Sequence, residues 1–401
     1  MTEIWYIGPT MSQEELSPVS LDAPGGDPPA LGIGLCLSGG GYRAMLFHLG
    51  VLWRLAELGY LGTENRTGKH GPIGTLQRVS SVSGGSIIAG ALGLAWDDLR
   101  VDDDDLLERF RELVVKPVEG FASQTTVSIW TAAWAAVIST VSKSIARVYR
   151  RRLYGDKTLQ DLPDSPRFVI NATNLQSGAL WRFSKPFTRD WRVGEIKNPT
   201  DSIASVVGAS SAFPPFLSPA RFKYDESQFT PGSGSGLQKP PYTTRPALSD
   251  GGVYDNLGLE TVFKNFQTLI VSNAGGKFKP KEKIVGDWAL QSYRVMNTID
   301  NQVRSLRKRV LISSLASLEK FGVYFSIRSD IKGYPAADKL PCSRERTLEL
   351  ADIPTDLAAK DQTTQRRLIN WGYAICDAGI RSWVEDGLPP PADFPYPDEG
   401  V

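Results

Sequence analysis

The chain has 401 residues, of which 41% are hydrophobic and 22% charged, so it can bury a sizeable core and is neither disordered nor fibrous. Forty-five Lys and Arg residues balance 44 Asp and Glu residues, and a protein this close to neutral has no global field that would attract nucleic acid. Cys36, Cys342 and Cys376 are far apart, which excludes a disulfide framework and a Cys-rich zinc site and favours a reduced, cytoplasmic setting.

The first thirty residues have neither the basic start nor the apolar run of a secretion signal, so we expect residues 1–30 to form an extended arm. The longest uncharged stretch is Phe121–Ser142. It contains many Ser and Thr residues and is too polar to predict a membrane span.

Two strand–helix pairs follow the arm. Leu31–Leu37 is a short apolar run typical of a buried strand, and Tyr42–Leu58 is apolar on nearly every side, which predicts a buried helix. Leu76–Val82 predicts a second strand, and the small apolar residues of Gly84–Ala95 predict a helix packed closely on a sheet. Each pair is joined by a short turn rich in glycine and serine.

The alternation of strands and helices continues downstream. Phe168–Ala172 predicts a strand, with Ala179–Phe183 as its hairpin return. Further elements are expected at Ile203–Ala209 (helix), Thr268–Val271 (strand), Trp288–Ser317 (helix) and Gln362–Val384 (helix). Strands that alternate with helices predict a three-layer α/β fold.

The turn after the second strand, Ser81-Val82-Ser83-Gly84-Gly85, has the setting of a nucleophile elbow. A serine on a sharp strand-to-helix turn projects its Oγ into the open, and its neighbours must be small because the turn is tight. The usual first glycine is replaced by Ser81. Taken alone, the segment is also compatible with an ordinary Ser/Gly turn that caps a helix.

The turn after the first strand, Ser38-Gly39-Gly40-Gly41-Tyr42-Arg43, can direct several backbone N–H groups at one point, at the positive end of a helix. Such a cradle can hold a phosphate or an oxyanion, and the alternative is a flexible connection. The segment lacks the lysine and the spacing of a nucleotide-binding P-loop and does not match the dinucleotide fingerprint.

A third segment, Ser249-Asp250-Gly251-Gly252, is either a simple Asp-Gly turn or a carboxylate that its glycine neighbours leave open to close approach. Asp255, a few residues later, is better explained as the N-cap of a helix over Asn256–Val262.

The histidine count decides which base can serve the serine. The only histidines, His48 and His70, both precede Ser83, so the Ser–acid–His order of an α/β-hydrolase triad is impossible. His48 falls inside the first buried helix and is expected to be a satisfied core residue, while His70 lies in a polar loop. A serine needs a base, and Asp250 is the best candidate provided that it is partly desolvated and hydrogen-bonded directly to Ser83.

Together, the three segments resemble the patatin-like phospholipase family, which combines a glycine-rich oxyanion loop, a serine elbow and a later Asp-Gly-Gly or Asp-Gly-Ala. The stretches that carry the resemblance are Gly39–Arg43, Val82–Gly85 and Asp250–Gly252, with Asn171–Asn174 and Ala209–Pro214 between them. Ser38–Met45 is also similar to the glycine loop of eukaryotic cytosolic phospholipases. The chain departs from the family pattern at Ser81 and at Ala44, where glycine is usual.

The resemblance covers roughly residues 31–275 and implies a three-layer sandwich with a central, mostly parallel sheet flanked by helices. It also implies a helical cap or lid insertion at about residues 100–155. We expect residues 276–387 to be a mostly helical extension of the same domain, for which no motif indicates a role, and residues 388–401 to be a flexible tail.

The mechanism implied by the resemblance needs no metal and no cofactor. Ser83 attacks an ester carbonyl while Asp250 accepts its proton, and backbone amides of the loop at Gly39, Gly40 and Gly41, with that of Gly84, hold the oxyanion. Asp250 then protonates the leaving alcohol and activates water for deacylation. Arg43 is expected to lie near a phospholipid phosphate, and the alternative is a structural ion pair at the loop.

Trp130 and Trp134 lie on one face of a predicted helix that ends in basic residues. This pattern is typical of a helix that lies on anionic lipid. The alternative is a cap over the active site with a solvated basic end, and the two are not exclusive because a lid can also contact lipid. The expected partners are a phospholipid or lysophospholipid substrate and a peripheral membrane surface, with no nucleic acid. Homo-oligomer formation is left open.

Two function classes are therefore carried forward. The first is a cytoplasmic serine acyl hydrolase, or an acyltransferase, acting on membrane lipids. The second is a non-catalytic, regulatory patatin-like protein whose glycine loop binds an anion or a nucleotide. A fluorophosphonate probe separates the two, because only an active nucleophile is labelled.

Overall fold

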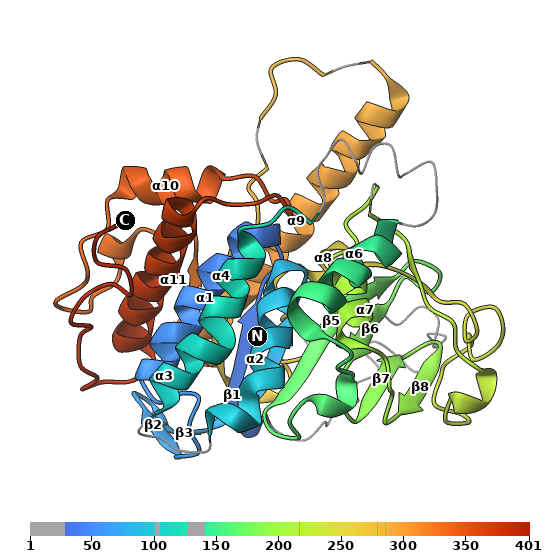
Figure 1. Ribbon diagram of the computed structural model, residues 1–401, viewed down its shortest axis with the longest axis horizontal. Helices are drawn as coiled ribbons and strands as arrows, with labels where there is room; N and C mark the ends of the chain where they lie inside the picture. Colours follow the sequence, from blue (N-terminus) through green and yellow to red (C-terminus); the bar gives the residue numbers. More distant parts are fainter. Residues whose placement is uncertain (1–28, 101–104, 127–140, 216, 279, 285) are drawn as a thin grey trace, which may run out of the picture.

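The computed structural model describes residues 29–100, 105–126, 141–215, 217–278, 280–284 and 286–401 (Figure 1). Most of the expected N-terminal arm and both lid tryptophans, Trp130 and Trp134, lie outside the described residues.

One ten-stranded sheet organises the molecule. Along its main path the order is β12 (Phe321–Ser326), β11 (Phe266–Asn273), β1 (Ala30–Leu37), β4 (Leu76–Ser81), β5 (Arg167–Asn174), β6 (Leu180–Phe183), β7 (Phe187–Asp190) and β8 (Gly194–Lys197). The first five of these strands are parallel, and the remaining three continue the sheet as an antiparallel meander. Two short strands, β10 (Ala247–Asp250) and β9 (Ala220–Arg221), branch from β5, and β2 (Arg66–Gly68) and β3 (Gly71–Gly74) form a separate hairpin.

The helices cover both faces of this sheet. They are α1 (Gly41–Glu57), α2 (Gly84–Leu99), α3 (Leu106–Phe110), α4 (Lys116–Ala122), α6 (Val141–Tyr149), α7 (Ile203–Ser210), α8 (Gly252–Asp255), α9 (Trp288–Ala316), α10 (Arg344–Asp352) and α11 (Gln362–Trp383). Short helical turns occur at η1 (Arg111–Val115), η2 (Arg150–Tyr154), η3 (Leu159–Asp161), η4 (Glu226–Gln228) and η5 (Ile331–Gly333). No described helix combines the length and the apolar character that crossing a membrane requires.

Successive side chains of a strand point to opposite faces of the sheet, so they enter two different cores. In β11, Ile270 enters the larger core, which is shared with α1, α2 and α11, while Leu269 and Val271 enter a smaller one together with Leu311 of α9. Figure 1 shows α1, α2 and α11 in front of the sheet. The prediction of a three-layer sandwich with a central, mostly parallel sheet flanked by helices is confirmed.

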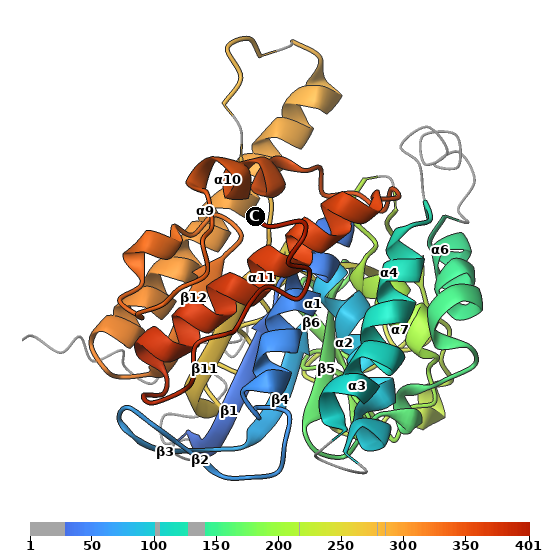
Figure 2. The ribbon, with the colours of Figure 1, turned by 60° about the vertical axis from the view of Figure 1, so that its left-hand side comes forward.

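The C-terminal helix α11 is packed directly against α1. A Cβ atom on Gly50 of α1 would lie 1.9 Å from the Ile369 carbonyl oxygen, and one on Gly372 of α11 would lie 1.9 Å from the Phe47 carbonyl oxygen. The two glycines therefore permit an approach that any side chain would prevent, and α11 completes the core around α1 (Figure 2).

The C-terminal tail differs from the expectation. Phe394 and Val401 are buried, the Asn370 side chain donates to the Tyr396 carbonyl at 2.8 Å, and the Tyr396 hydroxyl donates to Glu119 at 2.7 Å. The prediction of a flexible tail over 388–401 was wrong, because its aromatic residues find apolar partners that the abundance of proline and acidic residues obscured.

The segment that follows Asp250 also differs. The predicted helix over Asn256–Val262 is a series of turns, and the short helix α8 ends at Asp255. The Asp255 carboxylate accepts the Leu257 amide at 3.1 Å and the Glu260 amide at 2.8 Å. The Asp255 carboxylate therefore accepts backbone amides as an N-cap does, but these hydrogen bonds close a turn and do not start a helix.

Candidate active site

The topology of the sheet brings Ser83 and Asp250 together. Strand β4 runs parallel to β5 with Ser81 opposite Ile170, and β10 runs antiparallel to β5 with Asp250 opposite Ala172. One edge of β5 is paired with β6. The other edge is paired first with β4 and, beyond the end of β4, with β10. Ser83, which follows β4, and Asp250, at the end of β10, therefore lie next to each other beside β5.

Ser83 sits on a sharp turn. Its backbone has φ 50° and ψ −118°, a region that non-glycine residues rarely adopt. The turn is held by the Ser83 amide, which donates to the Ser210 hydroxyl at 2.9 Å, and the Ser210 hydroxyl donates to the Asn171 carbonyl at 2.6 Å. A strained serine between a strand and a helix is the geometry expected of a nucleophile elbow.

The replacement of the elbow's usual first glycine leaves this geometry intact. The Ser81 side chain is fully buried and accepts a hydrogen bond from the Ser86 hydroxyl at 3.0 Å. The Ser81 hydroxyl therefore has a hydrogen-bond partner within the buried part of the turn.

Asp250 is the acid that faces Ser83. Its carboxylate is buried and accepts a hydrogen bond from the Gly252 amide at 2.7 Å, and the Ser83 hydroxyl lies close enough to it to lower its pKa. Burial raises the pKa of Asp250 to about 7. The Gly252 amide and the Ser83 hydroxyl lower this pKa only in part, and the charge of Asp300 raises it further. Asp250 is thus a desolvated carboxylate beside Ser83.

The glycine loop lies against the same serine. A Cβ on Gly39 would come 3.2 Å from the Cβ of Ser83, and a Cβ on Gly84 would come 2.1 Å from the Gly41 carbonyl oxygen. The first residues of α1 and α2 are thus in contact, and the positive ends of two helix dipoles meet beside Ser83. The Gly39 amide donates to the Asn256 carbonyl at 3.1 Å, whereas the described residues provide no hydrogen-bond acceptor for the amides of Gly40, Gly41 and Gly84.

Arg43 does not lie where the sequence analysis placed it. Its guanidinium is buried and donates to the carbonyls of Ala351, Ile353 and Ala274 at 3.0, 2.6 and 2.7 Å. Burial, followed by the charge of Arg328, lowers its pKa to about 10. The prediction that Arg43 contacts a substrate phosphate was wrong: the side chain ties the start of α1 to the C-terminal part of the chain and does not line the pocket.

His48 is a satisfied core residue, as predicted. Its Nε2 donates to the Ser38 carbonyl at 3.0 Å, and its Nδ1 accepts from the Ser272 hydroxyl at 2.9 Å. Burial lowers the pKa of His48 to about 4, so the ring is neutral at physiological pH. His70 is exposed and stacks on Phe321.

A pocket of ≈ 570 Å³ includes Ser83 and Asp250 in its lining. Part of its wall comes from residues beyond 275, for which the sequence analysis found no role. These are Gly276, Lys277, Phe278, Lys281, Tyr293, Arg294, Asn297, Asp300, Arg304, Pro354, Thr355, Asp356 and Leu357. The spacing of Tyr293, Asn297, Asp300 and Arg304 along one helix face is the signal that could have found them.

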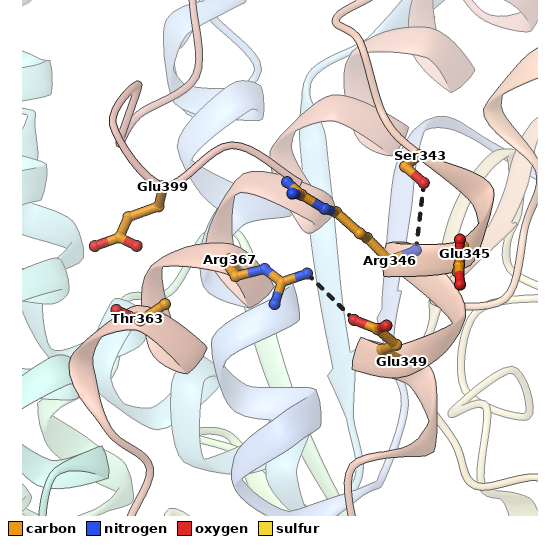
Figure 3. Close-up of a pocket in the computed structure, with 7 residues that line it drawn as sticks. All are labelled: Ser343, Glu345, Arg346, Glu349, Thr363, Arg367 and Glu399. Atoms are coloured by element: carbon orange, nitrogen blue, oxygen red, sulfur yellow. Dashed lines mark hydrogen bonds and ion pairs between the residues drawn. The ribbon is translucent and has the colours of Figure 1, made fainter.

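A second cavity, of ≈ 540 Å³, lies between α10, α11 and the C-terminal tail (Figure 3). Its lining is Ser343, Glu345, Arg346, Glu349, Thr363, Arg367 and Glu399. Ser343 accepts from the Arg346 amide at the start of α10, and Arg367 pairs with Glu349 at 3.6 Å, as the dashed lines show. The Ser343 hydroxyl is used as a helix cap.

Residues 35–263, more than half of the chain, match the model of the patatin-like phospholipase family. The chain belongs to this family. The patatin-like region contains the glycine loop, Ser83 and Asp250, and its boundaries agree with the extent of the resemblance found in the sequence. Membership makes the chain a relative of lipid acyl hydrolases.

The patatin-like chain is also similar to solved structures at low sequence identity. Human GIVD cytosolic phospholipase A2, in complex with a methyl γ-linolenyl fluorophosphonate inhibitor and terbium chloride, is 14% identical over 88% of this chain and 59% of that chain, with a TM-score of 0.44. VipD from Legionella pneumophila is 16% identical over 82% of this chain and 66% of that chain, with a TM-score of 0.31. The chain thus spans less than two thirds of the length of either. A search of the curated proteins found no match.

Proposed function

We propose that the chain is a serine acyl hydrolase of the phospholipase or lysophospholipase type, which cleaves carboxylic esters of membrane lipids. The observation that carries the proposal is the position of the Ser83 hydroxyl beside a buried Asp250 whose pKa is raised to about 7, with both residues in one pocket. A carboxylate in this state is a strong enough base for a serine and an effective acid for a leaving alcohol near neutral pH.

The reaction follows from this geometry. Ser83 Oγ attacks the ester carbonyl as Asp250 takes its proton, and the amides of Gly40, Gly41 and Gly84 stabilise the negative charge on the carbonyl oxygen. Asp250 returns the proton to the departing alcohol. Water then attacks the acyl-enzyme, with Asp250 again as the base.

The pocket supports a lipid as the substrate. Phe213, Leu217 and Leu357 offer apolar contact for an acyl chain beside the dyad. Lys277 and Lys281 line the same pocket and, in the role first assigned to Arg43, can bind the phosphate of a phospholipid or lysophospholipid. We also propose that the enzyme works in the cytoplasm at a membrane surface, which fits its three unpaired cysteines.

A fluorophosphonate probe tests the nucleophile. We expect the wild-type protein to be labelled and Ser83→Ala to remain unlabelled. Ser211→Ala is the matched control, because Ser211 lines the same pocket but does not contact Asp250 through a hydrogen bond. It should retain labelling. A folded wild-type protein that resists the probe would argue for the non-catalytic, anion-binding alternative.

The substrate class is tested with a mixed lipid extract. Released fatty acids and lysolipids are identified for the wild type and for Ser83→Ala, with and without an added alcohol acceptor. Free fatty acid indicates a hydrolase, whereas a new ester of the added alcohol indicates an acyltransferase. Products that also form with Ser83→Ala would contradict the proposed mechanism.

A further inference from the structure

Helix α9 has two faces with different surroundings. The inner face lines the pocket with Tyr293, Asn297, Asp300 and Arg304, and it places Leu311 in the smaller core. The outer face faces solvent. Figures 1 and 2 show the N-terminal half of α9 standing out from the body of the molecule.

The outer face carries an apolar stripe. Trp288 is 78% exposed, and the other members are between 52% and 59% exposed. The stripe consists of Trp288, Val295, Ile299, Leu306 and Val310. At 100° per residue these positions fall within an arc of about 60°, and at 1.5 Å per residue they extend over about 33 Å. Exposed apolar residues in such a register indicate an interaction surface.

The same part of the chain is basic. Residues 276–310 contain nine Lys and Arg residues and three Asp and Glu residues, in a chain that is otherwise almost neutral. Lys281 and Lys283 are exposed near the start of α9, and Lys308 and Arg309 are exposed near the end of the stripe. An apolar stripe with exposed cations near both ends complements a bilayer with anionic headgroups.

We propose that the outer face of α9 is the surface by which the protein docks on anionic lipid bilayers. The inference rests on the proposed function, because the inner face of the same helix forms one wall of the pocket above Ser83. With the stripe embedded among the headgroups, the pocket opens beside the lipid surface. A lipid can then enter along α9 without first crossing bulk water.

A second copy of the chain fits this surface less well. Pairing α9 with the same helix of another copy would bury the stripes, but the symmetry of such a dimer would bring two basic segments together. The charge of the segment therefore favours an anionic lipid surface over self-association.

The test is sedimentation of the full chain with vesicles of phosphatidylcholine, with or without phosphatidylserine. We expect binding to the mixed vesicles, weakened by high salt, and a loss of about tenfold or more in the double variant Trp288→Ala/Ile299→Ser. Hydrolysis of a short, soluble ester should be unchanged in this variant, since neither residue lines the pocket. The matched control is Trp383→Ala/Leu175→Ser, which changes residues that are 49% and 50% exposed outside α9.

The outcomes separate this proposal from the proposed function. Ser83→Ala should bind vesicles normally. Wild-type protein that hydrolyses the soluble ester but ignores vesicles, or a double variant that binds as well as the control, overturns docking by α9 alone. A double variant that only converts a dimer to a monomer, measured by light scattering, also overturns it in favour of a second copy. Wild-type protein that binds vesicles but has no esterase activity would contradict only the proposed function.

Discussion

Two buried aspartates in different regions of the molecule have opposite surroundings. In the helical layer, Asp377 of α11 accepts from Arg54 of α1 at 2.8 Å and from Arg381 at 2.7 Å. At the end of the sheet, the Asp250 carboxylate accepts from the Gly252 amide and lies beside the Ser83 hydroxyl, and no cation pairs with it among the residues the structure describes. Both residues are almost completely buried.

The two aspartates differ in whether arginine side chains pair with them. Two guanidinium groups bind the Asp377 carboxylate, so its charge joins two helices. Asp250 has no such partner, and its burial penalises the charged form. The first arrangement serves stability. The second keeps a carboxylate ready to gain and lose a proton near pH 7, at a cost in stability.

The largest effect is expected for Asp250→Asn. An amide cannot accept the proton of Ser83, so esterase activity should fall by about a thousandfold or more, while the circular dichroism spectrum is unchanged. The comparison variant Asp377→Asn, assayed on the folded fraction, should keep most of its activity. Activity within tenfold of wild type in Asp250→Asn would rule out Asp250 as the base.

The next effect concerns stability. Asp377→Ala leaves Arg54 and Arg381 without their shared carboxylate in a buried site, and we expect a loss of about 3–5 kcal/mol in the free energy of unfolding. Chemical denaturation measures this loss. Asp386→Ala is the control, because it breaks an ion pair of Lys69 with a largely exposed aspartate and should change stability little. Equal losses in the two variants would show that the buried pair has no special role.

The two regions also differ in how well the sequence predicts them. The turns at Gly39–Gly41 and Ser83 were predicted because their requirements are local: small residues between a strand and a helix. The strand that carries Asp250 was not predicted, because four residues are too few to show a period, and its position depends on pairing with β5. Asp250 itself was selected by elimination of the histidines and by the family resemblance.

Arg43 and α9 show what a sequence leaves undetermined. Arg43 is next to the glycine loop in the chain, but the helix that starts there directs its side chain towards carbonyls more than 200 residues away in sequence. The residues of α9 that line the pocket have a helical spacing in the sequence. The neighbouring sequence does not indicate that this helix face lies opposite Ser83. Both facts are set by tertiary packing.

The pH dependence of catalysis gives a smaller, graded effect. In the proposed mechanism Asp250 can act as a base only when ionised, and burial raises its pKa to about 7. We expect kcat/KM for a soluble ester to rise about tenfold per pH unit below this value and to level off above it. Asp377→Asn should keep the same profile, since Asp377 is not in the pocket. A profile that stays flat from pH 5 to 8, on the order of a thousandfold range in proton concentration, would contradict a base with this pKa.

The smallest expected effect is a gain in stability. Burial raises the pKa of Asp250 from 3.8 to about 7, so between these values the folded state binds a proton that the unfolded state has released. The wild-type protein therefore loses stability as the pH rises from about 4 to about 7. Asparagine does not titrate, and Asp250→Asn should melt about 2–4 °C above wild type at pH 8, with a smaller difference at pH 5. Asp377→Asn should melt below wild type at both pH values, because it weakens a paired charge. Opposite signs for the same substitution at two equally buried aspartates would show that the missing cation, and not burial alone, prepares Asp250 for proton transfer.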